Sequence, residues 1–173
     1  SFEHRNPATG ILPNEPDHGR WDSRVCTSEV GLWAACLLRA ADLADAPDLA
    51  EQAQEAVRAW LRYAWDPETG RYAGQVDVTT GRAVVTDERG HWPGRWSDPW
   101  NTIQWPTHDY PMELAESCLD LHARTRDDEY AHAVRRWAQI AFSTRPDYNR
   151  KAYAESYGRC IHLLARAGRH LGD

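Results

Sequence analysis

The stretch SEVGLWAACLLRAADLADAPDLAEQAQEAVRAWLRYA, residues 28–64, predicts two amphipathic helices and the turn between them. Its apolar residues recur every three or four positions, which places them on one face of each helix. They are Val30, Trp33, Leu37 and Ala41 in the first half and Ala53, Val57, Trp60 and Leu61 in the second. The linker ADAP at 44–47 is so short that the two helices must pack antiparallel, as an αα-hairpin.

Three later segments repeat this helical spacing. One opens at Pro111, a residue favoured in a first helical turn, and the others cover about 128–142 and 152–171. A short linker, RTRDD at 124–128, joins the first two of them. We therefore predict a second antiparallel hairpin followed by a fifth helix.

A faint repeat links the two hairpins. The motifs AVRAW at 56–60 and AVRRW at 133–137 each fall in the second helix of a pair. Repeated αα-hairpins stack into arrays or close into toroids. We therefore predict an all-α fold, built as one domain over 1–173 from an array of antiparallel αα-hairpins.

The composition is that of a globular protein. The chain has 173 residues, of which 42% are hydrophobic and 27% charged, and this suits one domain with a real core. Its net charge of −6 argues against non-specific binding to nucleic acid or to an anionic membrane, and no apolar run is long enough to span a bilayer. Because the chain starts at Ser1 rather than Met, we expect a processed or excised piece, and its location stays open.

The connection from about Trp65 to Tyr110 is unusually long, and such connections are functional or carry structure of their own. Within it, RYAGQVDV at 71–78 alternates like a strand, and RAVV after the next Thr-Gly turn can pair with it. The stretches NPATG at 6–10 and DPETG at 66–70 have the same turn pattern. We predict one β-hairpin in this connection and three turns that each close on a glycine with positive φ.

Cofactor and metal motifs are absent. No phosphate-binding loop, nucleophile elbow or HExxH sequence occurs, and the four cysteines form no CxxC pair. We expect no cofactor and no metal ion, although ligation by Asp17, His18 and Asp22 is conceivable. Cys36, Cys118 and Cys160 fall in helical patterns and are expected to be buried, while a disulfide stays possible.

A tryptophan-rich segment, HWPGRWSDPWNTIQWPTHDYP at 91–111, holds four of the nine tryptophans of the chain. Indole is costly to bury fully and tends to lie where one edge is wet. Sugar rings stack their C–H faces on such platforms, while their hydroxyls need the donors and acceptors that lie between these tryptophans. The segment favours a saccharide cleft. The alternative is that the tryptophans fill the space between the long connection and the helices.

These features together resemble (α/α)-toroid carbohydrate-active enzymes. The resemblance rests on the short-linked hairpins, the long loop with its β-hairpin, DPETGRY at 66–72 and WPTHDYP at 105–111. The group includes polysaccharide lyases, six-hairpin glycosidases and sugar 2-epimerases. It implies that this chain supplies part of a toroid and associates with the remainder of the ring or with copies of itself. A lyase would also imply a secreted or periplasmic location.

The resemblance implies a site where inter-hairpin loops meet the ends of inner helices. Its candidate catalytic residues are His108, Asn101, Asp109, Tyr157 and Arg159. Its candidate substrate-binding residues are Trp96, Trp100, Trp105, Arg95, Gln104, Trp21 and Arg24. Several of these have structural alternatives: His108 and Asp109 as caps of the third helix, Tyr157 as core, and Arg159 as part of a solvated face with Glu155, His162, Arg166 and Arg169.

The reaction expected first is β-elimination in a uronate-containing polysaccharide. A lyase needs a base and a group that lets the sugar carboxylate accept charge, and His108 with Asn101 suits these roles. A glycoside hydrolase would instead use two acids from Asp98, Asp109 and Glu155. An epimerase would use His91 and His108. A non-catalytic carbohydrate-binding domain or a helical-repeat interaction domain is the alternative outside enzymes.

Overall fold

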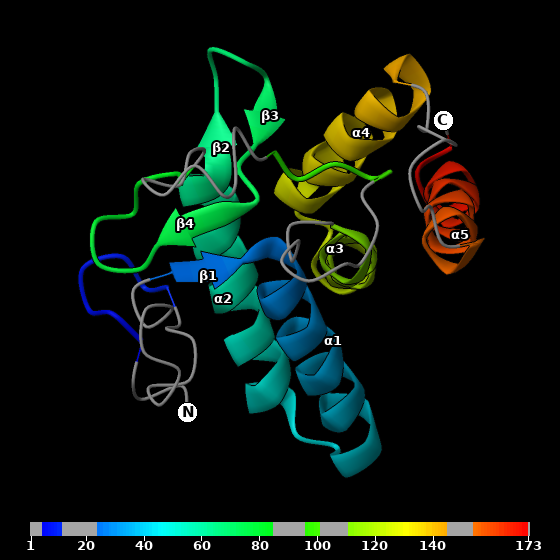
Figure 1. Ribbon diagram of the computed structural model, residues 1–173. Helices are drawn as coiled ribbons and strands as arrows, with labels where there is room; N and C mark the ends of the chain where they lie inside the picture. Colours follow the sequence, from blue (N-terminus) through cyan, green and yellow to red (C-terminus); the bar gives the residue numbers. More distant parts are fainter. Residues whose placement is uncertain (1–4, 12–23, 85–95, 101–110, 145–153, 173) are drawn as a thin grey trace.

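A computed structural model of the chain describes residues 5–11, 24–84, 96–100, 111–144 and 154–172. Most of these residues are helical, so the mainly α-helical class predicted from the sequence is confirmed (Figure 1). The described residues form five helices: α1 (Thr27–Ala44), α2 (Pro47–Ala64), α3 (Met112–Thr125), α4 (Asp128–Ser143) and α5 (Ala154–Leu171).

Helices α1, α3 and α5 lie side by side and run in the same direction. Gly31, near the start of α1, packs against Leu114, near the start of α3. Near the ends of the same two helices, Arg124 donates to Asp42 at 2.7 Å. Between α3 and α5, an ion pair joins Glu113 in the first turn of α3 to Arg159 in the second turn of α5, and His122 contacts His170 near the last turns. These three helices therefore form one parallel layer, with α5 at the edge of the molecule (Figure 1).

Helices α2 and α4 form the second layer. Arg58 of α2 donates to Asp127, the residue that caps the start of α4, at 2.6 Å. This hydrogen bond is the main reason that the pKa of the Asp127 carboxyl lies below its usual range. Further along, the Arg136 guanidinium of α4 lies 3.6 Å from the ring centre of Trp65, which follows α2. Both helices therefore run the same way, antiparallel to the layer beside them.

The core is buried between the two layers. The two repeated motifs occupy equivalent places in it, because Val57 and Trp60 of α2 and Val134 and Trp137 of α4 are all at most 1% exposed. The ring of Trp137 lies 4.9 Å from that of Tyr72. In α2 and α4 the helical periodicity in the sequence thus identified the face that packs inward.

The closest approach between helices is at Gly31, where a Cβ would lie 2.3 Å from the backbone nitrogen of Leu114. We expect Gly31→Ala to lower the free energy of unfolding by about 1–2 kcal/mol, because overpacking against backbone outweighs alanine's better helix propensity. Gly158→Ala in α5 is the matched control: its Cβ would meet nothing within 4 Å, so stability should stay equal or rise by up to about 1 kcal/mol. Urea unfolding measures both, and equal effects would contradict the close approach.

Small antiparallel strand pairs lie over one end of α1 and α2. β1 (Arg24–Cys26) pairs with β4 (Gln75–Asp77), and β2 (Trp65–Asp66) pairs with β3 (Arg71–Tyr72). The predicted pairing across the second Thr-Gly turn is present as a bridge between Val76 and Ala83. The predicted continuous strand at 71–78 is wrong, because it is interrupted between β3 and β4 and its second half pairs with β1. β1 was not predicted.

The three predicted turns are confirmed. Asn6, Asp66 and Asp77 each accept hydrogen bonds from backbone N–H groups two or three residues later. Each turn closes on a glycine with φ near +70°, a conformation that residues with a Cβ rarely adopt. These turns hold the strand pairs against the helices.

Thr27, the first residue of α1, is buried, and its hydroxyl donates to the carbonyl of Gly74 at 3.1 Å. One expectation for the helices is wrong. Cys36, expected to be buried, is exposed, because it lies on the side of α1 away from the core. All four cysteines are free thiols, and burial raises the pKa of Cys160 to about 12, which suits a packed rather than a reactive thiol.

Candidate functional site

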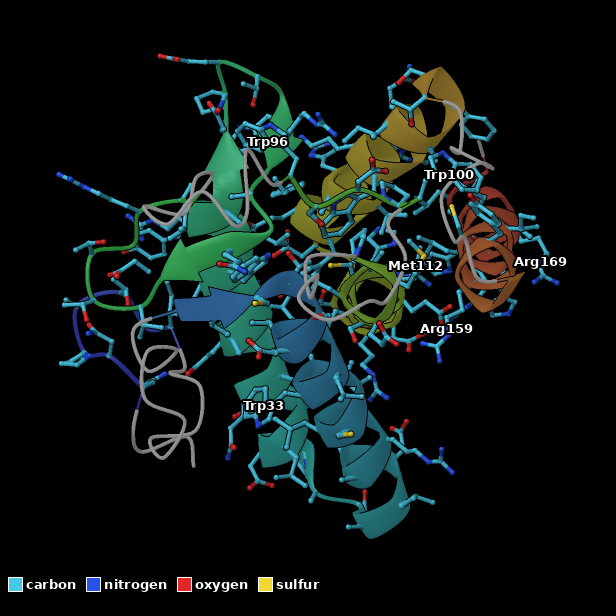
Figure 2. All side chains as sticks on the ribbon, viewed as in Figure 1. Trp33, Trp96, Trp100, Met112, Arg159 and Arg169 are labelled. Carbon is cyan, nitrogen blue, oxygen red and sulfur yellow. The ribbon has the colours of Figure 1, made fainter. Side chains whose placement is uncertain are left out.

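Helices α1, α3 and α5 enclose a groove of about 690 Å³, called the α1/α3/α5 groove below. It lies on the parallel layer, on the face away from α2 and α4. Figure 2 shows Arg159, one of its lining residues, between α3 and α5. The lining residues are Ala35, Leu38, Arg39, Asp42, Met112, Glu113, Glu116, Ser117, Asp120, Ala123, Arg124, Arg159 and His162.

Helix α3 presents a row of carboxylates to the groove. Glu113, Glu116 and Asp120 are three and four residues apart, so they share one face of the helix. The opposite faces of α3 carry Leu114, Leu121 and the other buried residues that fix its rotation. The core of the protein therefore holds this acidic row toward α5.

Helix α5 presents a matching basic row. Its residues Cys160, Leu163 and Ala167 are buried, which turns the neighbouring positions of the helix toward α3. These positions hold Arg159, His162 and Arg166, again three and four residues apart. Arg159 pairs with Glu113, and Arg166 donates to both Glu116 and Asp120 at 2.8 Å. Rows of opposite charge thus join α3 to α5 along the groove.

His162 is the residue of this row that can act as a base. Its Nδ1 lies 3.1 Å from a carboxylate oxygen of Glu116, and its side chain is 59% exposed. A carboxylate only accepts hydrogen bonds, so in the neutral imidazole Nδ1 is the nitrogen that carries the proton. The lone pair then lies on Nε2, the other ring nitrogen. Because Arg166 holds the same carboxylate, the Glu116–His162 pair is positioned as in a general-base dyad.

Arg159 is available to a ligand as well as to Glu113. The side chain of Arg159 is 42% exposed, and that of Glu113 is 22% exposed. Ion pairs with this much access to water contribute only about 0–1 kcal/mol to stability. The exposed part of the Arg159 guanidinium can therefore also meet a carboxylate on a ligand in the groove.

The floor of the groove is apolar and carries one hydroxyl. Leu38, Met112 and Ser117 line the groove and are at most 3% exposed. The Ser117 Oγ has no hydrogen-bond partner among the described residues. Leaving a buried hydroxyl unpaired costs about 1–3 kcal/mol, so such a group is commonly explained by a ligand or an ordered water. The groove thus combines an apolar floor with polar sides, as small-molecule sites do.

The structure places three of the sequence-predicted site residues on or next to α5. Arg159 lines the α1/α3/α5 groove. Tyr157, two residues earlier and therefore on another side of α5, meets Trp100 edge-on, with the ring centres 5.8 Å apart. The indole Nε1 of Trp100 donates to the carbonyl of Ala141 at 3.0 Å, so Trp100 also anchors its segment to α4. Asp98, an acid of the hydrolase alternative, accepts from the Trp100 N–H at 2.9 Å.

Trp96 lies elsewhere. Its backbone pairs with Ala73 next to β3, and the Arg71 guanidinium lies 5.8 Å from its ring centre. Figure 2 shows Trp96 beside the β2–β3 pair and Trp100 between α4 and α5, so the two predicted sugar platforms are not neighbours. Arg24 opens β1, but its side chain lies outside the described part of the structure. Also outside it are Trp21, His91, Arg95, Asn101, Gln104, Trp105, His108, Asp109, the Asp17/His18/Asp22 group and the side chain of Glu155.

Sequence reasoning missed the roles of His162, Glu116 and Ser117. It placed His162 with Arg159, Arg166 and Arg169 on a solvated face of the fifth helix. The structure directs the first three of these to α3, while the Arg169 side chain donates to the carbonyl of Ala165 on its own helix at 3.3 Å. The acidic row with the same spacing on the third helix was the available signal.

Two general searches and the comparisons with known proteins are negative. Among the described residues, no group of three or more His, Cys, Asp and Glu side chains could hold a metal ion. No helix in that part of the chain has the length and apolar character needed to cross a membrane. No protein-family model, curated protein or solved structure matches the chain. The chemistry of the groove is therefore the basis for a functional proposal.

Proposed function

We propose that this protein is a carbohydrate-active enzyme that cleaves a uronate-containing polysaccharide by β-elimination in the α1/α3/α5 groove. The observation that carries the proposal is the Glu116–His162 dyad, one turn from Arg159, above an apolar floor. These residues have the roles that a lyase needs: a base and a cation that accepts the sugar carboxylate. The proposal keeps the reaction expected from the sequence and assigns the base to His162 in place of His108.

The arrangement of the helices supports the same class. In an (α/α) toroid, alternate helices form an inner parallel ring, and the substrate lies on that ring. The parallel layer α1, α3 and α5 would be part of the inner ring, with α2 and α4 outside it. The chain would then contribute a portion of the toroid, completed by the remainder of the protein or by further copies. The groove would face the centre of the ring.

The proposed reaction needs two proton transfers, one from the sugar carbon and one to the leaving oxygen, and the scheme uses no cofactor. Arg159 binds the uronate carboxylate and stabilises the negative charge that develops there. The Nε2 atom of His162 takes the proton from the carbon beside the carboxylate, and the electron pair of that C–H bond forms a C=C bond. The glycosidic C–O bond breaks with its electron pair moving to the leaving oxygen, which takes a proton from the imidazolium or from water.

The charge of the groove is compatible with an acidic substrate. The chain has a net charge of −6, which would repel a polyanion at long range. Within the groove, however, Arg124 pairs with Asp42, Arg159 pairs with Glu113, and Arg166 pairs with Glu116 and Asp120. Each of the four carboxylates that line the groove thus contacts an arginine, with Arg166 shared by two of them, so the local repulsion is reduced.

The deciding experiment offers the full chain a panel of acidic and neutral polysaccharides. Ultraviolet absorbance of the new C=C bond and release of reducing ends are followed together. A lyase raises both on a uronate polymer and neither on a neutral glucan. Release of reducing ends without a rise in absorbance would overturn β-elimination. No change in either assay would overturn an enzymatic role in favour of a binding domain.

Hydrolysis is the second candidate, favoured by the three carboxylates of α3 on the groove. A glycoside hydrolase uses one carboxylic acid to protonate the leaving oxygen and one carboxylate as nucleophile or base. Glu113 and Asp120 would take these roles more readily than Glu116, which both His162 and Arg166 contact. Reducing ends released from a neutral polysaccharide, and lost in Asp120→Asn, would establish this alternative.

A further inference from the structure

Arg39 of α1 differs from the other charged residues that line the groove. The other charged side chains that line the groove each contact a group of opposite charge on a neighbouring helix. Arg39 lines the groove and is exposed, and the described residues provide it with no hydrogen-bond or ion-pair partner. Arg39 is therefore the groove cation that a ligand can meet without displacing a carboxylate of the described residues, and it lies on the α1 side, opposite the basic row of α5.

The register of the helices places Arg39 relative to the proposed base. Gly31 lies opposite Leu114, and Asp42 pairs with Arg124, so residues of α1 and α3 are matched along their whole shared length. Arg39 is then level with the turn of α3 that follows Asp120, whereas His162 is level with Glu116. At 1.5 Å of rise per residue, Arg39 is roughly 8 Å further along the groove than His162.

Ser117 lies between these two levels, on the floor. The residue is 1% exposed, and its Oγ has no hydrogen-bond partner among the described residues, although it lines the groove. Arg39 and Ser117 therefore offer a free guanidinium and an unpaired buried hydroxyl within about one helical turn of each other along the axis. An acidic group and a neighbouring hydroxyl on one ligand would satisfy both.

We propose that Arg39 and Ser117 form a second subsite that binds an acidic sugar unit next to the one at His162. The subsite rests on the proposed function. It adds the inference that two neighbouring sugar units of the substrate, rather than one, carry an acidic group. Arg39 binds the carboxylate or sulfate of the second unit through its guanidinium, and Ser117 forms a hydrogen bond with a hydroxyl of the same unit. Arg159 and Arg39 thus bind acidic groups on opposite sides of the proposed base, His162.

The test compares Arg39→Gln with Arg82→Gln, which removes the same charge from an exposed turn outside the groove. Both are made in a His162→Gln chain so that a bound sugar is not cleaved during calorimetric titration. The probes are an oligogalacturonate, a heparin oligosaccharide and a cello-oligosaccharide, which present carboxylates, sulfates and no charge. Arg39→Gln should weaken binding of the acidic probe by about tenfold and leave binding of the neutral probe unchanged. Arg82→Gln should leave the affinity for every probe unchanged.

The probes and variants separate the possible failures. A preference for the oligogalacturonate or for heparin identifies the acidic group as carboxylate or sulfate. Acidic probes that bind equally well to both arginine variants overturn the subsite while leaving the groove and the cleavage assay unaffected. A chain that binds none of the probes overturns the subsite, and the cleavage assay on the unmodified chain decides the proposed function separately.

Ser117→Ala is an independent check. Because its hydroxyl has no partner among the described residues, its loss should not lower the unfolding midpoint. Binding of the acidic probe should still weaken by about threefold or more, since a hydrogen bond to the sugar is lost. A fall in stability with unchanged binding would show a structural role for Ser117 and overturn its place in the subsite.

Discussion

Replacing His162 by glutamine should lower the rate of polysaccharide cleavage by about 10²- to 10⁴-fold, the contribution typical of a general base. Glutamine keeps the size and polarity of the side chain and loses the basic nitrogen. Stability should change little, because the His162–Glu116 contact is more than half exposed on the histidine side. The measurement is the initial rate of C=C absorbance, with the thermal unfolding midpoint recorded for the same sample.

Two histidine variants provide the controls for this experiment. His132→Gln alters an exposed histidine of α4 and should leave the rate unchanged. His108→Gln tests the base predicted from the sequence, which lies outside the described residues. A large loss of rate in His108→Gln together with full activity in His162→Gln would move the base to the tryptophan-rich segment and would contradict the Glu116–His162 dyad.

Replacing Trp137 by alanine should lower the free energy of unfolding by about 3–5 kcal/mol, the usual cost of deleting a buried aromatic ring. Trp137 is fully buried in α4 and packs on Tyr72, which belongs to β3. The substitution therefore removes contacts between the helices and the strands as well as within the helical core. Small domains are stable by only about 5–15 kcal/mol, so this variant should unfold at a much lower urea concentration.

Trp137→Phe distinguishes the contribution of the aromatic ring to stability from that of the indole N–H group. The indole Nε1 of Trp137 is buried and has no partner among the described residues, so phenylalanine removes no hydrogen bond there. We expect it to cost only about 1–2 kcal/mol, because most of the ring volume is retained. Urea unfolding of both variants gives the comparison. Equal losses for Ala and Phe would indicate that the Nε1 is hydrogen-bonded after all.

The helices could be predicted because their information is local. Val57 and Trp60, like Val134 and Trp137, occur at a spacing that is apolar on one side only, and all four are buried. The three turns could also be predicted, since an Asn or Asp side chain and a positive-φ glycine lie within five residues of one another. β1 could not, because a three-residue strand has no clear pattern of its own and forms only where β4 pairs with it.

The candidate site needed the tertiary structure. The sequence by itself determined that the third helix carries Glu113, Glu116 and Asp120 along one side and that the fifth carries a basic row with the same spacing. Which side of one helix faces which side of another depends on their rotation about their own axes. That rotation is set by buried residues distant in sequence, among them Leu121 and Leu163, which pack into the common core. Only this packing turned the two rows toward each other and left His162, Arg39 and Ser117 on the same groove.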